Sequence, residues 1–159
     1  MSVNNIAKKG FTLIELLVVI TIIAALAVVV FVALNPAKRL QDARDARRTT
    51  DVDSLLTAVH TYIVDNKGSY PTGLSAGMSE VSLGTAVASC QNTAGGCNAL
   101  GATCLDLSTP LVKYLKTIPT DPKNGSAAAT QYTVVVDANG IVSIKACGAE
   151  GGSNIIISR

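Results

Sequence analysis

The chain has 159 residues, with 13 basic and 11 acidic side chains and a formal net charge of +2. Lys8 and Lys9 lie in the first ten residues, so the remainder holds 11 cations against 11 acids and offers no electrostatic basis for binding nucleic acid. An apolar run near the N-terminus takes up the chain as far as about residue 34, which leaves length for one small domain and excludes a large multidomain enzyme.

The apolar run extends over residues 16–34, carries no charge, and has Thr21 as its only polar side chain. Counted from Phe11 to Leu34, the segment would form a helix of about 36 Å, enough to cross a hydrocarbon core about 30 Å thick. A buried core helix would need far more surrounding protein than this chain supplies. The sequence therefore predicts a single membrane-spanning helix over residues 11–34.

The segment before this helix is short and polar and ends in Lys8-Lys9-Gly10, whereas an ordinary secretory signal has its cleavage site after the apolar region. Gly10 followed by FTLIELLVVITIIAALA resembles the class III leader and N-terminal helix of type IV pilins and pseudopilins. The resemblance implies that residues 1–10 are a leader and that prepilin peptidase cuts between Gly10 and Phe11. It also implies that the peptidase methylates the new N-terminus at Phe11.

The one acid of this region, Glu15, has two interpretations. In the first, Thr12 caps the helix and Glu15 is its reciprocal partner, because the Thr-x-x-Glu spacing is that of a capping box. In the second, cleavage gives Phe11 a cationic α-amino group, and Glu15 lies four residues on along the same helical face. The pilin resemblance implies that this acid recognises the N-terminus of a neighbouring subunit, which would make Phe11 and Glu15 assembly residues. The cap can act in the precursor and the charge pair after cleavage.

Residues 35–66 are predicted to form the amphipathic half of a long helix. Asn35-Pro36 indicates a kink or a local loosening, because proline cannot continue the hydrogen-bond ladder. Apolar residues recur at spacings of three and four from Val52 to Ile63, and Asn66-Lys67-Gly68 supplies a stop. The single histidine, His60, falls beside this stripe, where a packing role is favoured over a general base. With no nucleophile motif and no phosphate loop, we do not expect an enzyme.

A charged stretch with interleaved signs covers residues 38–53. We interpret it as a solvated helix face with pairs such as Asp42 with Arg39 and Asp45 with Arg48. The alternative is that these charges form salt bridges between subunits of a polymer.

Residues 67–159 are predicted to form a small disulfide-bonded head. A loop rich in Gly, Ser, Ala and Thr covers residues 68–109, and the four cysteines lack the close spacing of a zinc site. Two disulfides in an oxidising compartment are expected. Of three possible connectivities we prefer Cys90 with Cys97 and Cys104 with Cys147, although the sequence does not choose among them.

The last third predicts a short helix at residues 108–115, then strands at 131–137 and 141–147 joined by Ala138-Asn139-Gly140, and a further strand at 155–157. The fold class is therefore α+β, a long N-terminal helix packed on a small antiparallel sheet, which is also the type IV pilin architecture. Residues 114–122 resemble a turn found in pseudopilins and many minimal pilins. Turn formation explains the acids and amides of this region better than a calcium ion does, and no metal or cofactor is expected (Asp106, Asp121, Asn124, Asp137 and Asn139).

Three functions remain. The first is a pilin that polymerises with itself through its N-terminal helix and depends on prepilin peptidase and a pilus assembly machinery. The alternative is a pseudopilin of a type II secretion or DNA-uptake machine, and the third is a membrane-anchored binding domain or enzyme. Nucleic acid is a partner only as a trait of some relatives. We expect a cytoplasmic leader, an extracytoplasmic head, and a surface pilus after assembly. The resemblance and the cysteines outweigh the five cations within fifteen residues after Leu34, which by themselves favour the opposite orientation.

Overall fold

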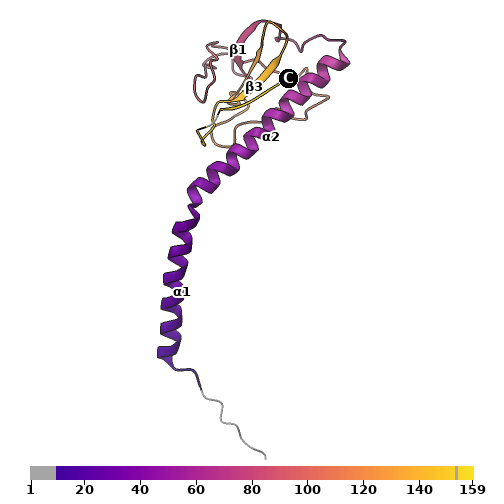
Figure 1. Cartoon of the computed structure of the whole chain (residues 1–159). Coiled ribbons are helices and arrows are strands. Elements are labelled where there is room, and N and C mark those ends of the chain that lie inside the picture. Colours follow the sequence, from indigo (N-terminus) through magenta and orange to yellow (C-terminus); the bar gives the residue numbers. More distant parts are fainter. Residues whose placement is uncertain (1–9, 153) are drawn as a thin grey trace, which may run out of the picture. The chain divides into compact units, whose positions relative to one another are not determined.

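The computed structural model describes residues 10–152 and 154–159, and the chain divides into two units, one ending at Arg39 and the other beginning at Leu40. Six elements follow one another along the chain (Figure 1): α1 (Leu13–Leu34), α2 (Pro36–Asp65), β1 (Met78–Ser82), β2 (Tyr132–Val136), β3 (Val142–Ala146) and β4 (Ile155–Ser158).

Helix α1 is apolar on all sides, and none of its residues is buried by the protein. Its one polar side chain within the run, Thr21, donates a hydrogen bond from Oγ1 to the carbonyl of Val18 at 2.8 Å, so the hydroxyl is satisfied within the helix. In the described part of the chain, one helical stretch, which starts at Leu13, is long and apolar enough to cross a membrane. A helix that is apolar all round and uncovered by protein is suited to lipid.

The predicted interruption at Asn35-Pro36 is confirmed. Asn35 has a left-handed backbone with φ 40° and ψ 72°, and it ends α1 as its C-cap. Its side-chain Oδ1 lies 3.4 Å from the backbone nitrogen of Lys38, so Asn35 also caps the first turn of α2. Pro36 occupies the first position of α2, where its missing N–H leaves no carbonyl without a partner.

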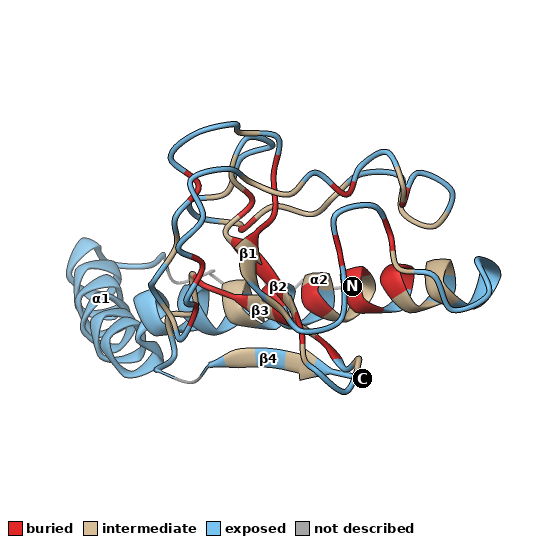
Figure 2. Ribbon diagram, turned by 90° about the horizontal axis from the view of Figure 1, so that it is seen from above, coloured by how far each residue is buried: buried red, intermediate tan, exposed pale blue. Residues whose placement is uncertain are grey.

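Helix α2 carries the apolar stripe that builds the core of the second unit. Val52, Leu55, Leu56 and Val59 are fully buried, and they cluster with inward-facing residues of β2 and β3 (Tyr132, Val134, Val136, Val142, Ile144 and Ala146). Figure 2 shows the buried side of α2 facing the strands. The predicted amphipathic helix is thus confirmed.

The end of α2 also agrees with the prediction. Gly68 has φ 88°, and its N–H donates to the carbonyl of Ile63 at 2.8 Å, which is the closing bond of a Schellman motif.

The four strands form one antiparallel sheet in the order β1-β2-β3-β4. Tyr132 pairs with Ala146 and Val136 with Val142, so the hairpin turns through Asp137 to Ile141. Asp137 accepts hydrogen bonds at Oδ1 from the N–H groups of Asn139 and Ile141, both at 2.8 Å, which fixes the turn. The α+β fold class is confirmed, together with the three strands expected near the C-terminus.

Two predictions of secondary structure are wrong. Residues 108–114 form a series of hydrogen-bonded turns instead of a helix. The segment expected to be loop contains β1, where Val81 pairs with Val134 and Ser82 with Thr133. The sequence signal for β1 is weak, because Met78 and Val81 are its only apolar residues and they do not alternate. A bulge between these two residues accommodates their spacing where β1 pairs with β2.

The preferred disulfide connectivity is wrong as well. Cys90 pairs with Cys104 and Cys97 with Cys147, with Cα separations of 5.2 and 5.6 Å. The reason is the fold of residues 90–104, which double back on themselves: Asn92 and Ala99 exchange backbone hydrogen bonds, so Cys90 and Cys104 meet at the base of the loop. Cys97 lies near its tip, which packs on the sheet next to Cys147.

Candidate processing and assembly site

The start of α1 is organised by a complete capping box. Thr12 has an extended backbone, with φ −85° and ψ 151°, and its Oγ1 accepts the N–H of Glu15 at 3.3 Å. The carboxylate of Glu15 returns to Thr12, because its Oε2 lies 2.8 Å from the backbone nitrogen and 2.7 Å from the hydroxyl oxygen of Thr12. The first of the two interpretations of Glu15 is therefore what this uncleaved chain adopts.

The capping box leaves one carboxylate oxygen of Glu15 available. All three hydrogen bonds use Oε2 or the backbone, and Oε1 accepts none from residues 10–152 or 154–159. The contacts to Thr12 do not involve the residues before it, so they do not depend on an intact leader. Glu15 can thus cap its own helix with one oxygen and hold a cation with the other.

The peptide that joins Gly10 to Phe11 lies in the open. Gly10 has no helical or strand structure, and Phe11 keeps 77% of its surface exposed. A Cβ added to Gly10 would meet no described atom within 4 Å, so nothing in the described chain requires glycine here. Any requirement for glycine at this position must come from a molecule that handles the junction.

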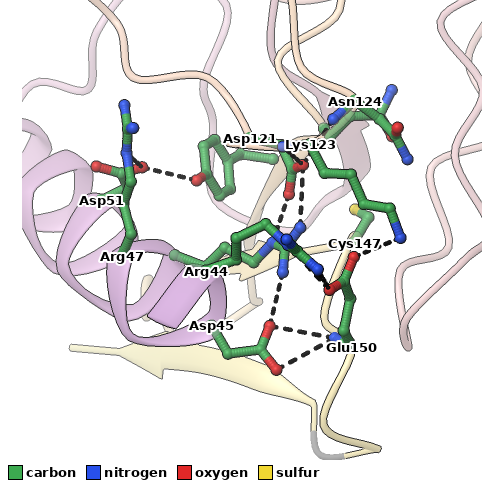
Figure 3. Close-up of polar contacts among 12 residues, drawn as sticks. Arg44, Asp45, Arg47, Asp51, Asp121, Lys123, Asn124, Cys147 and Glu150 are labelled. Atoms are coloured by element: carbon green, nitrogen blue, oxygen red, sulfur yellow. Dashed lines mark hydrogen bonds and ion pairs between the residues drawn. The ribbon is translucent and has the colours of Figure 1, made fainter. Parts of the chain in front are cut away.

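A second polar cluster lies in the other unit and is centred on Arg48. Figure 3 labels three acids of this cluster, Asp45, Asp121 and Glu150. The guanidinium of Arg48 is fully buried and binds both carboxylate oxygens of Asp121, from Nε to Oδ2 at 2.5 Å and from Nη2 to Oδ1 at 3.1 Å. The remaining nitrogen, Nη1, donates to Asp45 at 2.7 Å. Every nitrogen of the side chain therefore has an acceptor, which a buried guanidinium requires.

Asp121 in turn orders the loop that follows it. Its Oδ1 accepts the N–H groups of Lys123 and Asn124 at 2.8 and 3.0 Å, and its own N–H donates to the carbonyl of Thr130 at 2.9 Å. The ion pair with Arg48 thus connects α2 to the segment just before β2.

Glu150 adds a second connection between α2 and the C-terminal part of the chain. Its Oε2 lies 3.0 Å from Nε of Arg44, and its Oε1 lies 2.6 Å from Nζ of Lys123. Asp45 accepts the backbone N–H groups of Glu150 and Gly151, the latter at 2.7 Å. Figure 3 shows Arg44 and Lys123 converging on this one carboxylate. We call this group the charge cluster of α2 (Arg44, Asp45, Arg48, Asp121, Lys123 and Glu150).

The acids of the charge cluster are held in their ionised forms. Burial by itself raises the pKa of Asp121, but the hydrogen bonds from Arg48 and from the N–H groups of Asn124 and Lys123 outweigh burial and leave the pKa below its usual value. Lys123 and Arg44 lower the pKa of Glu150 in the same way. The hydrogen bonds that Arg48 donates to Asp121 raise the pKa of Arg48 above its usual value, so the guanidinium is charged.

The sequence interpretation of the charged stretch is therefore right in one part and wrong in another. The pair between Asp45 and Arg48 is confirmed, whereas no ion pair joins Asp42 to Arg39 within α2. Arg48 does not lie on a solvated face, because it is completely buried. Its partner Asp121 lies 73 residues further along the chain, and Glu150, the partner of Arg44, lies 106 residues beyond Arg44, so no local spacing indicates either acid.

The residues considered for calcium are engaged elsewhere. Asp121 binds Arg48, Asp137 binds its own turn, and Asp106 accepts the N–H of Ser108 at 2.8 Å. The described residues contain no group of three acidic, cysteine or histidine side chains that could hold a metal ion. His60 is half-buried on α2, beside the core residue Val59.

Residues 6–31 match the family model of the prokaryotic N-terminal methylation motif. The chain therefore carries the N-terminal signature on which its resemblance to type IV pilins and pseudopilins rests, and this signature supports its being a substrate of prepilin peptidase. The motif belongs to the assembly of structural subunits and is not that of an enzyme family. Comparisons with curated proteins and with solved structures yield no significant match.

Proposed function

We propose that this chain is the structural subunit of a type IV pilus-like surface filament. The observation that carries the proposal is the coincidence of the methylation motif with the geometry at its centre. An exposed Gly10–Phe11 junction is followed by a carboxylate with one oxygen that accepts no hydrogen bond from the described residues. A membrane anchor alone has no need of either feature.

In this proposal the chain has four functional segments. Residues 1–10 are the leader, 11–34 the membrane and filament-core helix, 35–66 the amphipathic half that supports the head, and 67–159 the head itself. The precursor waits in the membrane with its leader in the cytoplasm and its head outside. Two disulfides support an extracytoplasmic head, since such bonds persist in oxidising compartments.

Cleavage changes the charge at the end of α1. Hydrolysis of the Gly10–Phe11 bond leaves the leader with a carboxylate and Phe11 with an ammonium group, which then receives a methyl group from a methyl donor. Glu15 of a neighbouring subunit can hold this cation through the oxygen that the capping box leaves free. In an apolar filament core such a pair is stronger than in water, and an ammonium left without a partner there is costly.

The test compares Glu15→Leu with Thr12→Val in a strain that lacks the native gene. Glu15→Leu makes the helix more apolar, so we expect cleavage and membrane accumulation at normal levels but no protein in sheared surface filaments. Thr12→Val removes the hydroxyl of the cap and keeps the carboxylate, so filaments should still form. If both variants lose filaments equally, Glu15 acts only as a cap, and if both keep them, the carboxylate has no role in assembly.

The processing step has its own test. Gly10→Val should leave the full-length precursor in the membrane, whereas intact-mass analysis of the wild type should give a chain that begins at a methylated Phe11. Because a Cβ at Gly10 meets nothing in the described chain, folding should be unchanged, and a block would report the fit of the junction in the peptidase. Retention of residues 1–10 in assembled filaments would contradict the proposal. A pseudopilin would be processed in the same way but would give no long sheared filaments from the wild type.

A further inference from the structure

Two cations lie just beyond α1, and the described residues provide them with no ionic partner. Lys38 and Arg39 are both exposed on the first turns of α2, and neither takes part in an ion pair of the described chain. The next three cations along the sequence all have acidic partners (Arg44, Arg47 and Arg48). Lys38 and Arg39 are therefore free to bind a group outside the protein.

The position of these two cations matches a particular layer of a membrane. Helix α1 has 22 residues and a length of about 33 Å, close to the hydrocarbon thickness of about 30 Å. Lys38 follows Leu34 by four residues, or about 6 Å of helix, and Arg39 by one residue more. The headgroup layer extends about 5–8 Å beyond the hydrocarbon on each side, so both side chains reach lipid phosphates.

Processing makes this pair more important. Cleavage after Gly10 removes Lys8 and Lys9 from the other end of the helix. Between Phe11 and Gln41 the mature chain then has three charged side chains, which are Glu15, Lys38 and Arg39. The two cations are its only basic side chains at membrane depth.

We propose that Lys38 and Arg39 bind the phosphates of anionic phospholipids on the head side of the membrane and retain the stored subunit there. The inference rests on the proposed function, because it needs α1 to span a bilayer. Arg39 offers a planar guanidinium that can bind two phosphate oxygens, and Lys38 offers a compact ammonium group. A basic side chain at an anionic surface contributes about a fivefold preference, so the pair should favour anionic over zwitterionic lipid by about 25-fold.

The test is lipid retention by the full chain in a non-ionic detergent that contains equal amounts of phosphatidylglycerol and phosphatidylcholine. Native mass spectrometry gives the ratio of the two lipids bound to the protein. We expect phosphatidylglycerol to dominate for the wild type and the preference to fall about fivefold for each cation removed in Lys38→Gln, Arg39→Gln and the double variant. Lys38→Arg with Arg39→Lys should retain it.

The matched control is Lys113→Gln with Lys116→Gln, which removes the same charge from two exposed lysines of the head that form no described ion pair. It should leave the lipid ratio unchanged. The proposal is overturned if the wild type binds both lipids equally, if the Lys38 and Arg39 double variant keeps the full preference, or if the control loses as much. Flotation with phosphatidylcholine vesicles tests the membrane helix separately: a chain that floats but shows no anionic preference refutes the lipid site alone, and a chain that does not float refutes both.

Discussion

Replacing Arg48 by methionine should destabilise the head far more than any other single loss of charge on α2. Arg48 and Asp121 are both fully buried at their side chains, and the guanidinium binds the carboxylate through two nitrogens. Methionine fills most of the volume, so the main effect is a buried carboxylate without its cation. Breaking a buried pair from one side typically costs about 3–5 kcal/mol, a large share of the 5–15 kcal/mol that a domain has.

The neighbouring residue provides the control. Arg47 has 63% of its side chain exposed, and its Nε lies 3.8 Å from Oδ2 of Asp51. Arg47→Ala therefore removes a solvent-screened surface ion pair, which contributes about 0–1 kcal/mol to stability. The two substitutions therefore differ in burial and not in the charge removed.

The pH dependence has a definite sign. In the wild type the pKa of Asp121 is lowered, so its ion pair stabilises the head above the ordinary carboxyl pKa of about 4 and ceases to do so as the pH falls below that value. In Arg48→Met the carboxylate can be protonated at little cost once the solution is acidic. The difference in unfolding free energy between the two proteins should thus be greatest at neutral pH and shrink below about pH 4.

The assay is chemical denaturation of the full chain in detergent micelles, followed by near-ultraviolet circular dichroism. This signal reports the head, because Tyr132 is buried in its core and α1 contains no tyrosine. An Arg48→Met protein within about 1 kcal/mol of wild type, or no more affected than Arg47→Ala, would refute the assignment of Arg48 as a buried structural cation.

Two further predictions concern the loops of the head. Alkylation of native, unreduced protein should find none of the four cysteines free. Loss of the Cys97–Cys147 bond should lower the free energy of unfolding by about 1 kcal/mol more than loss of the Cys90–Cys104 bond, because it closes a loop of 50 residues against 14. Quantitative alkylation, or the reverse order of unfolding midpoints, would contradict this. Gly125→Ala should lower the free energy of unfolding by about 1–3 kcal/mol, since the added Cβ would collide with the backbone of Asp121. In the control Gly101→Ala the added Cβ has no described atom closer than 3.7 Å, so the free energy of unfolding should change by less than about 0.5 kcal/mol.

The parts of the fold that were predictable are those whose signal is local. The interruption at Asn35 follows from proline's missing donor, the end of α2 follows from Gly68, and the β2–β3 hairpin follows from Asn139-Gly140 between β-branched runs. In each case a few adjacent residues determine the backbone. The short helix at 108–115 failed because one cap and one proline do not supply the apolar face that stabilises a helix of that length.

The connectivity of the cysteines depends on tertiary structure. Residues 90–104 turn back on themselves at Gly95 and Gly96, both with positive φ, and an alanine at Gly95 would collide with the backbone of Cys147. The two glycines bring the tip of the loop against the sheet, where Cys97 meets Cys147, so the preferred pairing of Cys97 with Cys90 is not formed. A close approach of two backbones 52 residues apart, at Gly95 and Cys147, leaves no periodicity in either segment.

The charge cluster shows why a charged sequence can conceal a core position. Arg48 occupies the same helical face as Val52 and Leu55, at successive spacings of four and three, and so continues the apolar stripe toward the N-terminal end of α2. An arginine can occupy such a position because two acids accept the hydrogen bonds of its guanidinium. Asp45 lies one turn earlier on α2, and Asp121 lies in the loop before β2. A hydrophobic side chain there would pack as well but would not orient Asp121, whose carboxylate fixes the N–H groups of Lys123 and Asn124. The arginine therefore determines the conformation of the loop that leads into β2, and the same charge pair joins this loop to α2.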